Sequence, residues 1–133
     1  MLPSPADHVA ISALYADYCL TMDLDDVEGW VALFTPDARY EVYGRVFEGH
    51  DKLRKMLTAA PRGTHLGGLP RIEMVGPDRA SVRRNLVFLI RGSDDIRSAF
   101  YTDDLVRTPD GWRIAACRCQ FETADGLSDR PDR

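Results

Sequence analysis

Apolar side chains in the first part of the chain recur with the period of an α-helix. Between residues 11 and 22 they occupy positions i, i+3, i+4, i+7 and i+11, at Ile11, Leu14, Tyr15, Tyr18 and Met22. Ser4 and Pro5 precede this stripe as an N-cap and a proline suited to the first helical position. The pattern therefore predicts a helix from about Pro5 to Met22.

A second helical pattern follows at Val27, Trp30, Val31 and Phe34. Asp25 and Glu28 have the spacing of a capping box, and Pro36 cannot continue a helix. The pattern predicts a second helix from about Asp26 to Phe34.

Alternation at Arg39–Tyr43 predicts a strand that turns at Gly44. A third helix is predicted from about Asp51 to Ala60, with its buried side at Leu53, Met56 and Leu57. Beyond Gly63 the pattern changes to four long strand-like runs, about Thr64–Val75, Ala80–Arg91, Arg97–Arg107 and Trp112–Glu122. Short turns between long strands predict an antiparallel meander, and Gly67-Gly68 predicts a bulge that bends the first run.

Helices followed by a long antiparallel sheet are typical of an α+β fold. We expect a cone-like, strongly curved antiparallel sheet wrapped around the N-terminal helices, with more strand than helix. An apolar hollow in such a sheet is suited to a small molecule. Residues 1–123 are predicted to form a single domain, and residues 124–133 a loose polar tail.

Composition narrows the classes of function. The chain has 133 residues, 17 basic and 21 acidic, and a formal net charge of −4 at pH 7. This balance does not favour nucleic-acid binding, and no apolar run is long enough to cross a membrane. Because the N-terminus does not resemble a signal peptide, we expect a cytoplasmic protein. Neither the three cysteines nor the three histidines have metal-ligand spacing, so we predict no metal and no cofactor.

Asp23 fits its predicted surroundings poorly. It directly follows the apolar stripe, at the C-terminal end of a helix, where the helix dipole disfavours a carboxylate. Asp25 and Asp26 have capping or solvent roles, whereas Asp23 has none. This makes Asp23 the first candidate for chemistry.

The order of elements and two segments, DLDDVEGWVALFTPDARYE and YTDDLVRTPDGWRIAACR, resemble the SnoaL-like branch of the nuclear-transport-factor-2-like superfamily. The resemblance covers about residues 6–122. The superfamily includes polyketide cyclases, scytalone dehydratase, ketosteroid isomerase, lindane dehydrochlorinase and the small subunits of ring-hydroxylating dioxygenases. One fold thus carries several chemistries, and some members catalyse nothing.

The resemblance implies a catalytic dyad of Asp23 and His65. In the dehydratase and the dehydrochlorinase, an aspartate at the first position orients a histidine at the second, which acts as the general base. A carboxylate that keeps one ring nitrogen protonated leaves the other as a directed proton acceptor. The alternative is that His65 is a partly buried strand histidine and Asp23 a loop acid.

The resemblance to ketosteroid isomerase implies an oxyanion-binding role for Tyr18 and Asp103. The alternative is that Asp103 merely satisfies the Tyr18 hydroxyl. Val42 occupies the place of that enzyme's base, which disfavours isomerase chemistry of that kind. Met22 stands where scytalone dehydratase has a tyrosine that polarises the substrate carbonyl. Tyr18 stands where the dehydrochlorinase has a lysine that assists chloride departure. This chain therefore lacks one catalytic group of each enzyme.

We predict a cofactor-independent lyase or isomerase, dehydratase-like or cyclase-like, that removes a proton from a small, apolar, cyclic molecule. The alternatives are a non-catalytic ligand-binding module and an accessory subunit like those of the dioxygenases. Asn85 is either a polar contact or an exposed strand residue. The candidate substrate-binding residues are Met22, Trp30, Phe34, Tyr40, Val42, Leu57, Asn85, Phe88, Tyr101 and Phe121.

The run Leu86–Ile90 is apolar on both faces of its predicted strand. One face can cover the helices, and the other then needs a partner. We therefore predict a homodimer that forms through the outer face of the sheet.

Overall fold

The computed structural model describes residues 1–132. Their elements, in chain order, are α1 (Pro5–Asp23), α2 (Val27–Val31), β1 (Phe34–Val42), β2 (Arg45–Glu48), α3 (His50–Ala59), β3 (Gly63–Gly67), β4 (Arg71–Gly76), β5 (Arg79–Ile90), β6 (Ile96–Thr108), β7 (Gly111–Thr123) and β8 (Gly126–Ser128). The predicted α+β class and the excess of strand over helix are confirmed.

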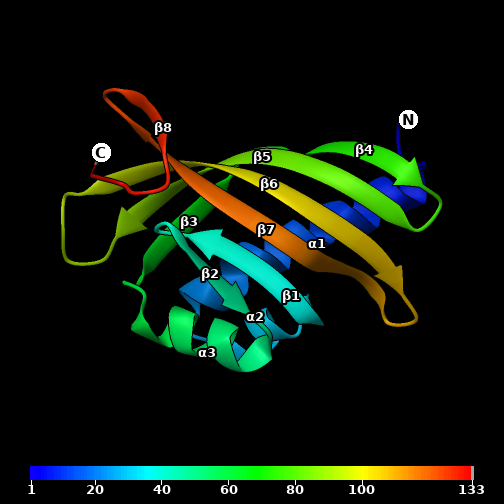
Figure 1. Cartoon of the computed structure of the whole chain (residues 1–133), viewed down its shortest axis with the longest axis horizontal. Coiled ribbons are helices and arrows are strands. Elements are labelled where there is room, and N and C mark those ends of the chain that lie inside the picture. The colour runs from blue at the N-terminus through cyan, green and yellow to red at the C-terminus, as the bar shows by residue number, and fades with distance from the viewer. Residues whose placement is uncertain (133) are drawn as a thin grey trace.

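All eight of these strands belong to one curved sheet (Figure 1). The order is β2-β1-β7-β6-β5-β3, with β4 also paired to β5 and β8 to β7. The predicted antiparallel meander is confirmed for β5, β6 and β7. The expectation of a wholly antiparallel sheet is wrong, because β1 pairs with β7 in parallel. The long connection from β1 to β7, which includes α3, supplies the crossover that a parallel pair requires.

Helix α1 lies along one face of the sheet, and α2 and α3 lie beyond its end, near β1 and β2 (Figure 1). The predicted apolar stripe is the buried side of α1, at Ile11, Leu14, Tyr15, Tyr18 and Met22. The Ser4 hydroxyl accepts a hydrogen bond from the backbone N–H of Asp7 at 3.1 Å, as an N-cap does. Local pattern and tertiary packing therefore agree over the whole of this helix.

Helix α2 is shorter than predicted, because β1 already begins at Phe34. Phe34 pairs with Ile114 of β7, and the sheet thus takes residues whose spacing suggested a helix. The register of β1 shifts after Phe34, where Pro36 can be accommodated. The N-cap of α2 is Asp26 and not Asp25, since the Asp26 side chain accepts from the backbone of Gly29 at 3.0 Å.

The predicted run from residue 64 to residue 75 consists of two strands, β3 and β4, which pair with successive parts of β5. The break follows Gly67. A Cβ atom on Gly68 would lie 1.9 Å from Asn85 Oδ1, so a larger residue there would require the Asn85 side chain to move. The tail beyond residue 123 is not wholly loose, because β8 forms a hairpin with β7. Within residues 1–132, no helix combines the length and apolar character needed to span a bilayer.

Candidate functional site

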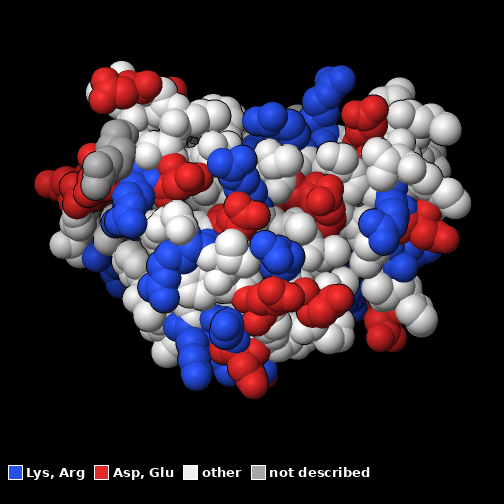
Figure 2. All heavy atoms as spheres, in the orientation of Figure 1, with Lys and Arg blue, Asp and Glu red and all other residues white. Residues whose placement is uncertain are grey.

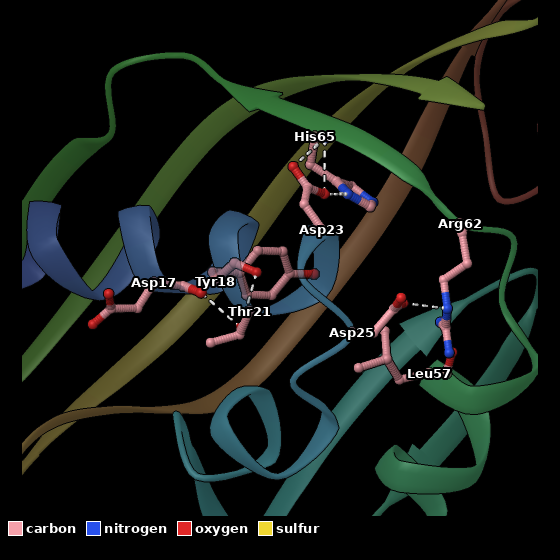
Figure 3. A network of polar contacts seen from close by, with 8 residues as sticks. All are labelled: Asp17, Tyr18, Thr21, Asp23, Asp25, Leu57, Arg62 and His65. Atoms are coloured by element: carbon pink, nitrogen blue, oxygen red, sulfur yellow. Dashed lines mark hydrogen bonds and ion pairs between the residues drawn. The ribbon is translucent and has the colours of Figure 1, made fainter. Parts of the chain in front are cut away.

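Asp23 and His65 are in direct contact, although 42 residues separate them (Figure 3). Asp23 Oδ1 lies 2.7 Å from His65 Nδ1, and both carboxylate oxygens accept from the backbone N–H of His65, at 3.1 and 3.0 Å. The imidazole stacks on the Phe88 ring, with the centroids 4.2 Å apart. Three hydrogen bonds and one stacking contact thus determine where the ring lies and which way it faces.

The end of α1 places Asp23 beside β3. Asp26 N–H donates to the carbonyl of Thr21 at 2.8 Å, and Asp25 has a left-handed φ of 59°. This is the geometry of a Schellman-like helix end, in which the residue with positive φ is usually glycine. Asp25 forms an ion pair with Arg62 at 2.6 Å, just before β3 (Figure 3). The same turn that ends the helix therefore also anchors the strand that carries His65.

Burial lowers the pKa of His65 below its ordinary value of 6.5, although the hydrogen bond and charge of Asp23 act in the opposite direction. The imidazole is therefore neutral near pH 7. With Nδ1 donating to Asp23, the lone pair of the neutral ring is on Nε2. His65 Nε2 makes no hydrogen bond within the described part of the chain, and His65 lines an inner cavity.

The cavity that His65 lines is narrow, with a volume of about 80 Å³, and mostly apolar. Eight of the ten predicted substrate-binding residues line it, namely Met22, Trp30, Tyr40, Val42, Leu57, Phe88, Tyr101 and Phe121. Phe34 does not line it and belongs to the core. Asn85 is exposed on the outer side of β5 beside Gly68, so the prediction of a pocket contact is wrong for it.

The predicted pairing of Tyr18 with Asp103 is also wrong. The Asp103 carboxylate accepts from the Tyr15 hydroxyl at 2.7 Å, one helical turn away from Tyr18. The Tyr18 hydroxyl instead forms a short hydrogen bond with the Tyr40 hydroxyl. Neither Tyr18 nor Asp103 lines the cavity. Sequence spacing could not separate Tyr15 from Tyr18, because both lie on the buried face of α1.

Asp103 belongs to a buried ion pair with Arg84, whose Nε lies 3.3 Å from Asp103 Oδ2. The guanidinium carbon of Arg84 lies 4.2 to 4.4 Å from three ring centroids, those of Tyr15, Tyr18 and Tyr101. Burial acts to lower the pKa of Arg84, but the effects of Asp103 and the surrounding tyrosines outweigh it. The pKa of Arg84 is therefore raised, and the side chain keeps its charge. Asp103 is therefore an acceptor that balances a buried cation, and not an acid that donates to a ligand.

Two of the polar side chains on the cavity wall, Tyr40 and Trp30, are buried and carry a hydrogen-bond donor. Burial raises the pKa of Tyr40 well above its ordinary value, so its hydroxyl keeps its proton. If Tyr18 donates to Tyr40, the Tyr40 proton is free for a ligand. Trp30 Nε1 is buried without a hydrogen-bond partner among residues 1–132. The Trp30 and Tyr40 rings lie 5.9 Å apart, so both donors occupy one region of the wall.

Sequence reasoning missed several wall residues. Leu86, Ala99 and Cys119 alternate in phase with the predicted wall residues of their strands, and that phase could have identified them. Tyr43 follows the end of β1, where the alternation of that strand no longer points to it. Met56 shares the buried side of α3 with Leu57, and Arg97 is in phase with Tyr101 on β6, so the pattern could have identified both as well. Among residues 1–132, no three His, Cys, Asp or Glu side chains are grouped so that they could hold a metal ion.

A family model described as "SnoaL-like domain" matches residues 4–118. The chain belongs to the SnoaL-like domain family. The match covers the helices, the dyad and all but the end of the meander, so the resemblance inferred from the sequence is confirmed.

Solved structures agree with this assignment. Rv3472 of Mycobacterium tuberculosis, a protein of unknown function, is 31% identical, with a TM-score of 0.83 over 92% of this chain and 80% of that one. A protein assigned as a scytalone dehydratase from Novosphingobium aromaticivorans is 21% identical, with a TM-score of 0.79 over 96% and 90% of the two chains. Hexachlorocyclohexane dehydrochlorinase LinA-type3 from Novosphingobium barchaimii is 19% identical, with a TM-score of 0.78 over 89% and 88%.

The last two similarities show a shared fold and no more. That fold is the cystatin-like or nuclear-transport-factor-2-like fold, as other matching structures are described. The predicted fold is thereby confirmed.

Proposed function

We propose that this SnoaL-like protein is a cofactor-independent lyase or isomerase that removes a proton from a small, largely apolar molecule. One observation supports the proposal above all: Asp23 binds His65 Nδ1, and the free Nε2 belongs to a residue of the cavity wall. A neutral imidazole held in one tautomer by a carboxylate is the usual arrangement of a histidine general base.

The first step transfers a proton from a substrate carbon to His65 Nε2. The electron pair of the broken C–H bond then forms a C=C bond, directly or through an enolate, and the Asp23 carboxylate stabilises the resulting imidazolium. In an elimination the leaving group departs with its bonding electrons, and His65 can return the proton to a departing hydroxyl as water. In an isomerisation the proton returns to a different carbon.

Negative charge that develops on a substrate oxygen needs a hydrogen-bond donor. We assign this role to Tyr40, backed by Tyr18, in place of the predicted Tyr18 and Asp103. The Trp30 indole N–H is a second donor on the same wall. Removal of one such donor in other enzymes costs a factor of about 10² to 10³ in rate.

Two structural neighbours are named for eliminations, a dehydratase and a dehydrochlorinase. Their names support elimination over isomerisation as the first reaction to test. The Met22 and Tyr18 substitutions noted above argue against a simple copy of either reaction.

Hydrogen–deuterium exchange tests the base without knowledge of the leaving group. Cyclic ketones and β-hydroxyketones are incubated with the protein in D₂O, and loss of the proton next to the carbonyl is followed by NMR. We expect at least one compound to exchange faster with the wild type than with His65→Gln, by a factor of about 10² to 10⁴.

His8→Gln is the matched control, because His8 is exposed on α1 and outside the cavity. It should exchange protons like the wild type. If wild type and His65→Gln bind the compounds equally and neither promotes exchange, the protein is a ligand-binding module and the proposal is wrong.

A further inference from the structure

The narrow cavity adjoins a wider vestibule between β2, α3 and the start of β6. This vestibule has a volume of about 570 Å³. The two cavities adjoin, since five residues line both, namely Tyr43, Met56, Ala60, Pro61 and Arg97. The inner cavity is small, so the adjoining vestibule offers the space for the rest of a larger ligand.

The vestibule is lined by four basic side chains, Arg45, Lys52, Lys55 and Arg97, and by no acidic one. Lys52 and Lys55 are three residues apart on α3 and therefore lie on one side of the helix. The Arg45 guanidinium lies over the Phe47 ring at 5.2 Å, and Arg97 donates to the Tyr43 hydroxyl at 3.1 Å. Figure 2 shows basic side chains gathered at the lower left, where β2 and α3 lie in Figure 1.

These cations differ from the arginines elsewhere in the protein that are paired with carboxylates. Arg39, Arg54, Arg62, Arg107 and Arg118 each lie within 4.0 Å of a carboxylate. None of the four vestibule cations has such a partner within residues 1–132. The chain as a whole is acidic, with a net charge of −4, whereas the lining of the vestibule is basic. Like charges grouped around a cleft attract a ligand of opposite charge.

From this arrangement we infer that the substrate carries an anionic group, such as a carboxylate, sulfate or phosphate, which the vestibule cations bind while the apolar ring occupies the inner cavity. That the ligand is a substrate rests on the proposed function, whereas its anionic group is inferred from the vestibule alone. Arg97 lines both cavities, so it can contact the anion at the point where the ring enters.

Two fluorescent probes that differ only in charge test the inference. 8-Anilinonaphthalene-1-sulfonate carries a sulfonate, and N-phenyl-1-naphthylamine has the same rings without it. We expect the wild-type protein to bind the sulfonate at least about tenfold more tightly than the amine. The difference should shrink as ionic strength rises, because salt screens exposed charges.

The double variant Lys52→Glu/Lys55→Glu should weaken sulfonate binding by about tenfold or more and leave amine binding unchanged. Arg79→Glu is the matched control, because Arg79 is exposed at the start of β5 and lines neither cavity. It should bind both probes like the wild type. Equal affinity for the two probes, a preference that survives the double variant, or no binding of either probe would each overturn the inference.

His65→Gln separates this inference from the proposed function. It should keep the preference for the sulfonate and lose proton exchange, because the base and the vestibule act on different parts of the ligand. If the wild-type protein prefers the sulfonate but never exchanges protons, the proposed enzymatic function is wrong and the inferred anion site stands.

Discussion

The Asp23 carboxylate holds His65 at two places, the ring nitrogen Nδ1 at 2.7 Å and the backbone N–H at 3.0 Å. A contact with the ring alone would leave the strand free to shift. A contact with the backbone alone would leave the tautomer undetermined. Together they turn Nε2 into a proton acceptor of defined position.

Asp23→Asn should lower kcat/KM by a factor of about 10² to 10⁴, because the amide lets the ring take the other tautomer. The variant should still fold, since an asparagine oxygen can accept from the His65 backbone. Steady-state kinetics and circular dichroism measure the two effects. A folded variant with wild-type turnover would show that Asp23 does not serve the base.

The pH profile follows from the lowered pKa of His65. Only the neutral ring accepts a proton, so kcat/KM should rise with pH through one ionisation whose midpoint lies below 6.5, the ordinary value. In Asp23→Asn the midpoint should fall further, because the carboxylate acts to raise this pKa. Midpoints above 6.5, or a midpoint that rises in the variant, would contradict the assignment of His65 as the base.

Tyr40→Phe should reduce kcat by a factor of about 10² to 10³ while the protein stays folded, since the variant removes one hydroxyl from the cavity wall. Tyr15→Phe is the matched control. It also removes one buried hydroxyl, but that hydroxyl bonds Asp103 and lies outside the cavity. Its expected effect is on stability, with kcat close to that of the wild type.

Asp103→Leu should destabilise the fold by about 3 to 5 kcal/mol, because it leaves the buried Arg84 charge without its partner. Denaturant unfolding measures the loss. The double variant Arg84→Met/Asp103→Leu removes both charges and should recover much of the stability. Equal stability of wild type and Asp103→Leu would mean that the ion pair does not matter to the fold.

A group of exposed apolar side chains on the sheet is the candidate interface of the predicted homodimer. Leu66, Val87, Leu89 and Ile96 lie at adjoining positions of β3, β5 and β6 and are 36% to 66% exposed. We expect sedimentation at micromolar concentration to show a dimer, and Leu89→Lys to shift it to monomer. A monomeric wild type at that concentration would exclude the interface.

The sequence by itself determined the parts of this protein that depend on local periodicity. The stripe of α1 and the alternation of β5, β6 and β7 assign each side chain to the inner or outer face without knowledge of the fold. The poor fit of Asp23 at a helix end, together with the family resemblance, pointed to its contact with His65. Short turns between long strands likewise determined the meander.

Only the tertiary structure decided which inward-facing groups meet. Arg84 and Asp103 both face inward on neighbouring strands, and the register of those strands brings the two side chains into contact. The position of α1 along the sheet determines that Tyr15, and not Tyr18, donates to Asp103. The same holds for the end of α2, where pairing of Phe34 with β7 replaced a helical turn, and for the vestibule, which joins residues of three elements. Periodicity specifies a face of an element, whereas a contact also requires the register and separation of elements far apart in the chain, which are set when the whole core packs.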